Sequence, residues 1–232
     1  VKDVRRIIST VPRKRQTMLF SATISPEIKE LASDVLHCPK TITIGRACSP
    51  IETITQYAYP VQKELKINLL LHMLSSGQMT SVLVFSRTKH GADKICRKLE
   101  RANVKSVVIH SNRSQNQRQK AIDGFRTGKF QVMVATDIAA RGIDIEGLSH
   151  VVNFDVPVFA EDYIHRIGRT GRAEAKGDAI TLVSPEERPY LHKIEKFIGR
   201  KFTLQDYPNF NIKKNSISAS PVQLQRPQDA VY

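Results

Sequence analysis

Residues 81–110 read S-V-L-V-F-S-R-T-K-H-G-A-D-K-I-C-R-K-L-E-R-A-N-V-K-S-V-V-I-H, and this stretch decides the fold class. It begins with a short apolar run at 81–86, which predicts a buried strand. A pattern of helical period follows at 89–102, and 106–110 is the next apolar run. Strand, helix and strand in immediate succession are typical of a parallel βαβ unit.

The same alternation continues toward the C-terminus. We expect one more helix at 115–125, strands at 131–135, 151–154 and 179–183, and a last helix at 186–198. The strands are almost continuously apolar, which indicates a parallel sheet covered by helices on both faces. The sequence therefore predicts an α/β domain that folds on its own over residues 63–205.

The regions on either side of this domain have a different character. Upstream, Met18 to Phe20 and Thr41 to Ile44 are strand candidates, and a helix is expected around 28–36. Residues 46–62 have no strong period and contain two prolines, so we interpret them as a linker. Residues 206–232 are polar and are predicted to be a disordered or extended tail.

Composition narrows the class of partner. The formal net charge is +14 and the pI is about 9.9, which favours a polyanionic partner, although a basic protein without one is an alternative. The three cysteines form no Cys-x-x-Cys pair, so neither a zinc site nor a disulfide framework is indicated. No apolar run is long enough to span a membrane, and the first residues carry no signal peptide pattern. Because no Met stands at the start, we expect the chain to begin within a longer protein.

Polar clusters follow three of the expected strands. They are 85–88 (F-S-R-T), 110–113 (H-S-N-R) and 136–144 (T-D-I-A-A-R-G-I-D). Ligands bind at the carboxyl ends of strands in open α/β sheets, and free N–H groups at a helix start favour an anion. Each cluster alone is equally well explained as a capped helix start. Three clusters at one edge of a basic domain favour a bound polyanion.

The segment 165–172, H-R-I-G-R-T-G-R, places three arginines among two glycines. Arginine carries a permanent charge on a planar fork that matches phosphate oxygens, and glycine lets the backbone approach a ligand closely. A solvated basic loop is the alternative for the segment alone. For His165 alone, a hydrogen-bonded structural role is more common than catalysis.

Taken together, these stretches resemble motifs of the DEAD-box RNA helicases. The similar segments are Ser21-Ala22-Thr23, 82–88, 114–118 (S-Q-N-Q-R), 134–144 and 165–172, in the family's order and spacing. The resemblance covers about residues 1–205 and is strongest to the bacterial RhlE-like group. It departs from the family at Ser111-Asn112, where glycine usually follows His110. It implies that residues 1–45 are the end of a first RecA-like domain and that 63–205 are the second.

The resemblance also implies a role for each matched residue. Arg169 and Arg172 would reach the γ-phosphate of ATP as arginine fingers, with Asp144 on the ribose and Gly142 in the same site. Contacts to RNA phosphates are implied for Thr136, Arg118, Arg87 and Thr88. Coupling of hydrolysis to domain closure is implied for Ser21, Thr23, Arg141 and His165. Phosphate contacts carry no sequence information, so we expect RNA binding without sequence preference.

Two motifs of a complete enzyme do not occur. The sequence has neither Gly-x-x-x-x-Gly-Lys-Ser/Thr nor Asp-Glu-Ala-Asp, so the phosphate-cradling loop and the Mg²⁺ ligands are expected upstream. The expected function is that of an ATP-dependent RNA helicase whose C-terminal portion is inactive alone. We further expect a cytoplasmic location and ribosomal or RNA-decay proteins as partners. A non-catalytic RNA- or protein-binding module and a DNA helicase are the alternatives.

Overall fold

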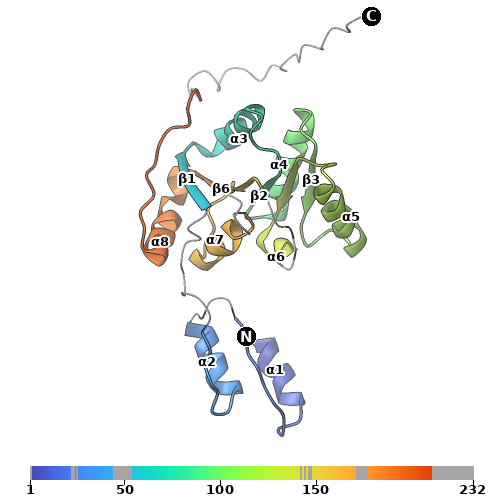
Figure 1. The fold of residues 1–232 in the computed structure, drawn as a ribbon, viewed down its shortest axis with the longest axis vertical. Coiled ribbons are helices and arrows are strands. Elements are labelled where there is room, and N and C mark those ends of the chain that lie inside the picture. The colour runs from blue at the N-terminus through green and yellow to red at the C-terminus, as the bar shows by residue number, and fades with distance from the viewer. Residues whose placement is uncertain are drawn as a thin grey trace, which may run out of the picture. The chain divides into compact units, whose positions relative to one another are not determined.

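The computed structural model describes residues 2–21, 24, 26–43, 54–141, 143, 145, 148–170 and 177–210. The chain divides into an N-terminal unit, residues 1–49, and a C-terminal unit, residues 50–232 (Figure 1). Residues 171–176, 211–232, Gly142 and Asp144 lie outside the described residues, as do Ala22 and Thr23. The predictions that fall on them stay predictions.

The C-terminal unit is built on a single sheet of parallel strands. The sheet order is β1-β6-β5-β2-β4-β3. The strands are β1 (Ile54–Pro60), β2 (Val82–Phe85), β3 (Ser106–Ile109), β4 (Val132–Ala135), β5 (His150–Asn153) and β6 (Gly177–Val183). The helices are α3 (Lys66–Ser75), α4 (Lys89–Arg101), α5 (Gln115–Arg126), α6 (Asp137–Ala140), α7 (Ala160–Ile167) and α8 (Arg188–Ile198), with 3₁₀ turns η1 (Lys63–Leu65) and η2 (Pro185–Glu187).

Helices cover both faces of this sheet, as the apolar strands predict. Side chains of β2 alternate between faces: Val82 and Val84 join a cluster with α3 and α4, whereas Leu83 and Phe85 join one with α5 and α6. A third cluster packs α7 and α8 against β1 and β6. Figure 1 shows α3 and α4 on one side of the sheet and α6, α7 and α8 on the other. Burial on both faces explains why the central strands β2 and β4 contain no polar residue.

The prediction of a linker at 46–62 is wrong for its second half. Residues 54–60 form β1, which pairs along its full length with β6. Pro60 is tolerated because it ends an edge strand, where a missing N–H breaks no central ladder. The predicted tail at 206–232 also differs in its first part. Tyr207 and Phe210 pack against the cluster under α3, and Leu204 bridges to Ala58.

The N-terminal unit contains α1 (Lys2–Thr10) and α2 (Pro26–Val35). Arg5 joins them through ion pairs with Glu30 at 2.9 Å and Asp34 at 2.5 Å. The strands predicted at 18–20 and 41–44 do not form in the residues described there. A strand needs a hydrogen-bonding neighbour, and the described part of this unit contains no other strand. Among all described residues, no helix is long and apolar enough to cross a membrane.

Candidate nucleotide and RNA sites

A buried arginine organises the carboxyl edge of the sheet. Arg166, on α7, has a side chain that is 2 % exposed. Its Nε and Nη2 donate to the two carboxylate oxygens of Asp137, at 2.6 and 2.8 Å. Its Nη1 donates to Asn153 Oδ1 and to the Asp155 carbonyl oxygen, and the guanidinium lies 5.0 Å from the centre of the Phe85 ring. A buried charge is tolerated only when it is paired and hydrogen-bonded in this way.

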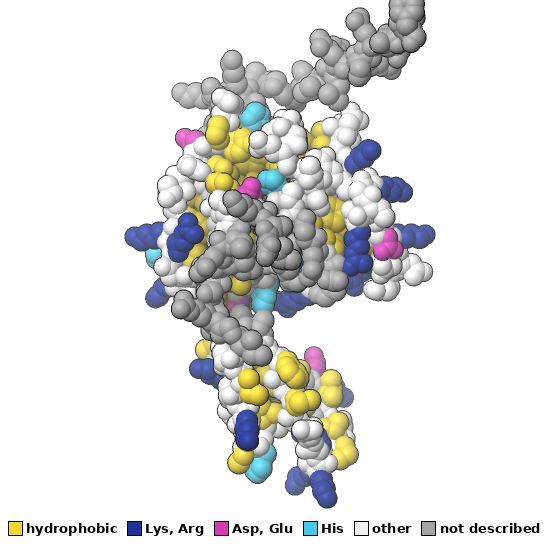
Figure 2. Space-filling model, viewed as in Figure 1, with side chains coloured by type: hydrophobic (Ala, Val, Ile, Leu, Met, Phe, Trp, Pro, Cys, Tyr) yellow, Lys and Arg dark blue, Asp and Glu magenta, His cyan; other side chains and the backbone are white. Residues whose placement is uncertain are grey.

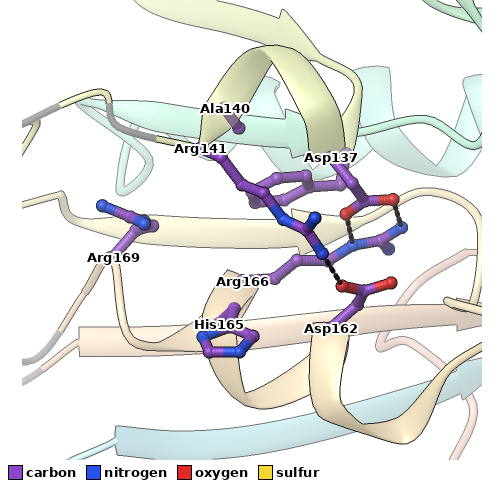
Figure 3. A pocket seen from close by; sticks show the side chains of 8 residues that line it. Asp137, Ala140, Arg141, Asp162, His165, Arg166 and Arg169 are labelled. Carbon is purple, nitrogen blue, oxygen red and sulfur yellow. Dashed lines mark hydrogen bonds and ion pairs between the residues drawn. The ribbon is translucent and has the colours of Figure 1, made fainter. Parts of the chain in front are cut away.

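The other two described arginines of this edge lie at its surface (Figure 3). Arg141 has a side chain that is 66 % exposed, and its Nη2 donates to Asp162 Oδ1 at 2.8 Å. Arg169 follows the end of α7 and donates to the Ile143 carbonyl oxygen at 3.0 Å. In Figure 3, Arg169 points away from the pair formed by Arg166 and Asp137. The segment 165–172 therefore combines a structural arginine with one that remains accessible.

These residues line a small pocket. Its lining is Phe85, Asp137, Ala140, Arg141, Asp162, His165, Arg166 and Arg169, and its volume is about 20 Å³. Pockets that enclose small-molecule ligands usually measure about 300–1,000 Å³. The described residues of this pocket therefore offer cationic groups to an anion but cannot enclose a nucleotide by themselves. Both carboxylates of the pocket are already bound by arginines, so they do not fit as Mg²⁺ ligands.

His165 lies in the same pocket and is half-buried. Among the described residues it makes no hydrogen bond and no ion pair, so the alternative of a hydrogen-bonded structural histidine finds no support. Ser21, the described member of the predicted coupling pair in the N-terminal unit, is exposed. Coupling roles for these residues stay predictions.

The predicted RNA-binding residues separate into two groups. Thr136 stands at the start of α6, after β4, and its hydroxyl caps no backbone N–H there. Arg118, on α5, donates from Nη2 to the Ala139 carbonyl oxygen of α6 at 3.2 Å. Its buried Nε has no hydrogen-bond partner among the described residues. These two residues thus lie near the starts of adjoining helices, and the Thr136 hydroxyl is the group that caps nothing there.

Arg87 and Thr88 are engaged differently. Thr88 caps α4, since its Oγ1 accepts from the Gly91 N–H at 3.0 Å. Arg87 donates from Nη2 to the Val156 carbonyl oxygen and to Glu187 Oε1, both at 3.1 Å. Its guanidinium also lies 5.2 Å from the centre of the Tyr190 ring. The helix-capping alternative is therefore correct for Thr88. The guanidinium of Arg87 faces Glu187 and Tyr190 and lines a second cavity, whose lining does not include Thr136.

The reasoning from sequence missed the carboxylates that hold these arginines. Asp137 and Asp162 were not predicted as site residues, and Arg166 was recognised only as part of its motif. Arg166 and Asp137 are 29 residues apart in the chain, so no local spacing reveals their pairing. Motif residues that follow β4 and that end α7 meet only because β4 and β5 both flank β2.

Comparisons with known proteins agree with the resemblance to DEAD-box RNA helicases. Residues 65–174 match the helicase conserved C-terminal domain. The chain is 37 % identical over 211 residues to the DEAD-box ATP-dependent RNA helicase CshA of Geobacillus kaustophilus, covering 91 % of this chain and 45 % of that protein. It is 39 % identical over 209 residues to the DEAD-box ATP-dependent RNA helicase RhpA of Helicobacter pylori, covering 90 % and 42 %. The chain thus spans less than half the length of these relatives.

Solved structures of DEAD-box proteins are similar to this chain in both sequence and fold. The crystal structure of the E. coli DEAD-box protein SrmB, bound to regulator of ribonuclease activity A, is 37 % identical; the match covers 66 % of this chain and 91 % of that chain, with a TM-score of 0.64. S. cerevisiae Dbp5 bound to RNA and ADP BeF3 is 29 % identical, covering 88 % and 55 %, with a TM-score of 0.78. The chain belongs to the DEAD-box family of RNA helicases. The predicted fold class, a RecA-like parallel sheet flanked by helices, is confirmed. Membership of the RhlE-like group stays a prediction.

Proposed function

We propose that this chain is the C-terminal portion of an ATP-dependent RNA helicase and supplies one wall of a shared ATP site. The observation that carries the proposal is the pocket around Arg166. It presents Arg141, His165 and Arg169 at the surface, but its volume of about 20 Å³ is far too small for a nucleotide. We expect this cationic edge to bind ATP only when a second domain supplies the other side of the site.

Arg169 is the described arginine best placed for the γ-phosphate. It is partly exposed, whereas Arg166 is buried and paired with Asp137. A planar guanidinium with a permanent charge stabilises the charge that develops on transferred phosphoryl oxygens. We assign the same role to Arg172, the ribose contact to Asp144 and a backbone contact to Gly142. ATP would bring Mg²⁺, whose ligands we place in the upstream domain.

RNA binding is proposed for the edge formed by Thr136 and Arg118. Both lie at helix starts on the carboxyl side of parallel strands, where N–H groups and the helix dipole favour phosphate. The similar structure of S. cerevisiae Dbp5 is bound to RNA, which supports a polynucleotide at this domain. Such contacts would act on any sequence, and the 2′-hydroxyl would favour RNA over DNA. Separation of short duplexes is the proposed outcome of the whole cycle.

Domain closure is proposed to use Arg141, His165, Ser21 and Thr23. In the present structure Arg141 is paired with Asp162, an exposed pair of the kind that contributes at most about 1 kcal/mol. So weak a pair can be exchanged for an acidic partner on the upstream domain. A cytoplasmic location and ribosomal or RNA-decay partners stay predictions; the similar protein SrmB was solved bound to regulator of ribonuclease activity A.

RNA-stimulated ATP hydrolysis tests the proposal. The whole protein should hydrolyse ATP faster with single-stranded RNA than without it, and single-stranded DNA of the same sequence should stimulate less. The 232-residue chain alone should show no hydrolysis above background at saturating RNA. RNA binding by the whole protein without any stimulated hydrolysis would favour the non-catalytic module. Equal stimulation by DNA would favour the DNA helicase.

A further inference from the structure

The outward face of α4 is a basic stripe, defined here as His90, Lys94, Arg97, Lys98 and Arg101. All of these side chains are exposed. They recur at intervals of one helical turn on the side opposite the buried residues of α4. From first to last they span roughly 16 Å along the helix axis. No acidic residue interrupts the stripe.

The acidic residues of α4 are occupied elsewhere. Asp93 accepts from His110 and Arg113, each at 3.1 Å, and Glu100 accepts from the Cys96 thiol. Within the described part of the chain, none of the stripe's cations has an ion pair or hydrogen bond through its side chain. Uncompensated cations on a helix face are available to a polyanion, which gains affinity by releasing counterions.

A large cavity is lined both by residues of the stripe and by residues of the strand-end cluster at 85–88. Its volume is about 730 Å³, and Lys94 and Lys98 line it together with Arg87 and Thr88. The cavity thus places two residues of the strand-end cluster and two of the stripe around one space. Pockets of this volume admit a group of nucleotide size.

The charges that line the cavity favour binding of an anion on the side formed by α4. Glu187 is neutralised by Lys66 and Arg87, and burial lowers the pKa of the Lys66 amino group although Glu187 opposes that effect. Glu64 and Glu186 are exposed in the part of the lining outside α4, where Lys63 is the neighbouring cation. The part of the lining that α4 contributes carries Lys94 and Lys98 and no acidic residue, so it attracts an anionic backbone.

We propose that RNA leaving the strand-end edge continues through this cavity and along the α4 stripe, which holds its phosphates. This inference rests on the proposed function, because it extends the RNA site assigned there. The stripe is a second phosphate-binding segment that only a longer RNA can reach. An acidic protein segment is the competing occupant, and the test below separates the two.

The experiment compares Lys94→Gln/Lys98→Gln/Arg101→Gln with a matched variant, Lys196→Gln/Arg200→Gln/Lys201→Gln, in the whole protein. The matched variant removes the same charge from exposed residues at and beyond the end of α8. Affinity is measured for an oligo-uridine series of increasing length and over a range of salt concentrations. RNA-stimulated ATP hydrolysis with the shortest active RNA is the separate readout for the proposed function.

With long RNA, the α4 variant should bind roughly 100-fold more weakly at ~0.1 M salt and lose about 2 from its logarithmic salt slope, since each single-strand phosphate contact contributes about 0.7. With the shortest RNA, its affinity and its stimulated hydrolysis should equal those of the wild type. The matched variant should bind all lengths normally. Binding to poly-glutamate is measured alongside as the probe for an acidic protein segment. The proposal is overturned if the α4 variant loses affinity equally at every RNA length, if it binds long RNA normally, or if poly-glutamate is the only polymer whose binding it loses. Absence of hydrolysis in the wild type would instead refute the proposed function.

Discussion

The two units of this chain differ in how they bury apolar surface. The C-terminal unit packs three hydrophobic clusters around its sheet, and its buried Arg166 and Asn153 are paired with each other. In the described part of the N-terminal unit only Leu31 is buried, while Ile7, Met18, Phe20 and Ile42 are exposed. Figure 2 shows hydrophobic side chains gathered on the surface of this unit. The C-terminal unit has the composition and burial of a complete domain. The described part of the N-terminal unit has those of a part of a domain.

The difference explains why the C-terminal unit can hold the side chains of its own wall of the proposed site in place. A functional side chain is held in place only if its support is itself packed. Arg166 anchors α7 to the start of α6 and to β5, so the accessible Arg141 and Arg169 project from a rigid frame. The apolar surface of the N-terminal unit is of the kind that marks a missing neighbour, in agreement with the predicted remnant of a first domain at 1–45.

The largest effect is expected at Arg166. Arg166→Met should lower the free energy of unfolding of the C-terminal unit by about 3 kcal/mol, because it leaves Asp137 and Asn153 without their partner. Denaturant unfolding followed by circular dichroism measures this. Arg141→Met, in the same pocket but 66 % exposed, is the matched control and should change stability by less than about 1 kcal/mol. Equal losses in the two variants would contradict the distinction between a supporting and an accessible arginine.

A smaller effect is expected from acid. Burial lowers the pKa of His150 below its ordinary value, although Asp178, 3.5 Å away, opposes that effect. The unfolded chain therefore binds a proton at this residue before the folded chain does. The stability is fully present above about pH 6.5 and decreases as the pH falls from there toward the folded pKa. His150→Gln should flatten this part of the profile of unfolding free energy against pH. An unchanged slope would show that His150 is not its source.

The smallest effect is expected at Phe20, whose side chain is 87 % exposed. In the 232-residue chain, Phe20→Ser should change thermal stability by no more than about 0.5 kcal/mol. In the whole protein, where the remnant interpretation predicts a packed first domain, the same change should cost about 3–5 kcal/mol. Thermal unfolding of both proteins provides the comparison. A small effect in the whole protein would remove the support for a remnant.

Periodicity was sufficient for the centre of the fold and insufficient at its edges. The strands expected at 81–86, 106–110 and 131–135 form within a residue or two of their predicted ends. These strands are apolar because both of their faces are covered. β1 escaped prediction because prolines flank it and because its exposed edge weakens the pattern.

The sequence predicted candidate residues for the site but not the division of roles among them. The motif at 165–172 predicts a phosphate-binding segment, yet which of its arginines is buried depends on contacts with β5 and α6. Thr88 was equally consistent with a phosphate contact and a helix cap, and only the hydrogen bond to Gly91 decides for the cap. The residue types therefore limit which chemistry the site can perform, and tertiary contacts decide which residue has which role.

The most direct test of the account is the ATP turnover of the whole protein carrying Arg169→Ala. If this chain supplies an arginine to a shared ATP site, RNA-stimulated turnover should fall by about 10³ or more, and Arg169→Lys should restore little because an ammonium lacks the planar fork. Affinity for single-stranded RNA in the absence of nucleotide should stay within about twofold of the wild type, since the RNA contacts are proposed for Thr136 and Arg118 and not for Arg169. Near-normal turnover by Arg169→Ala would contradict the account and leave the non-catalytic module as the better description.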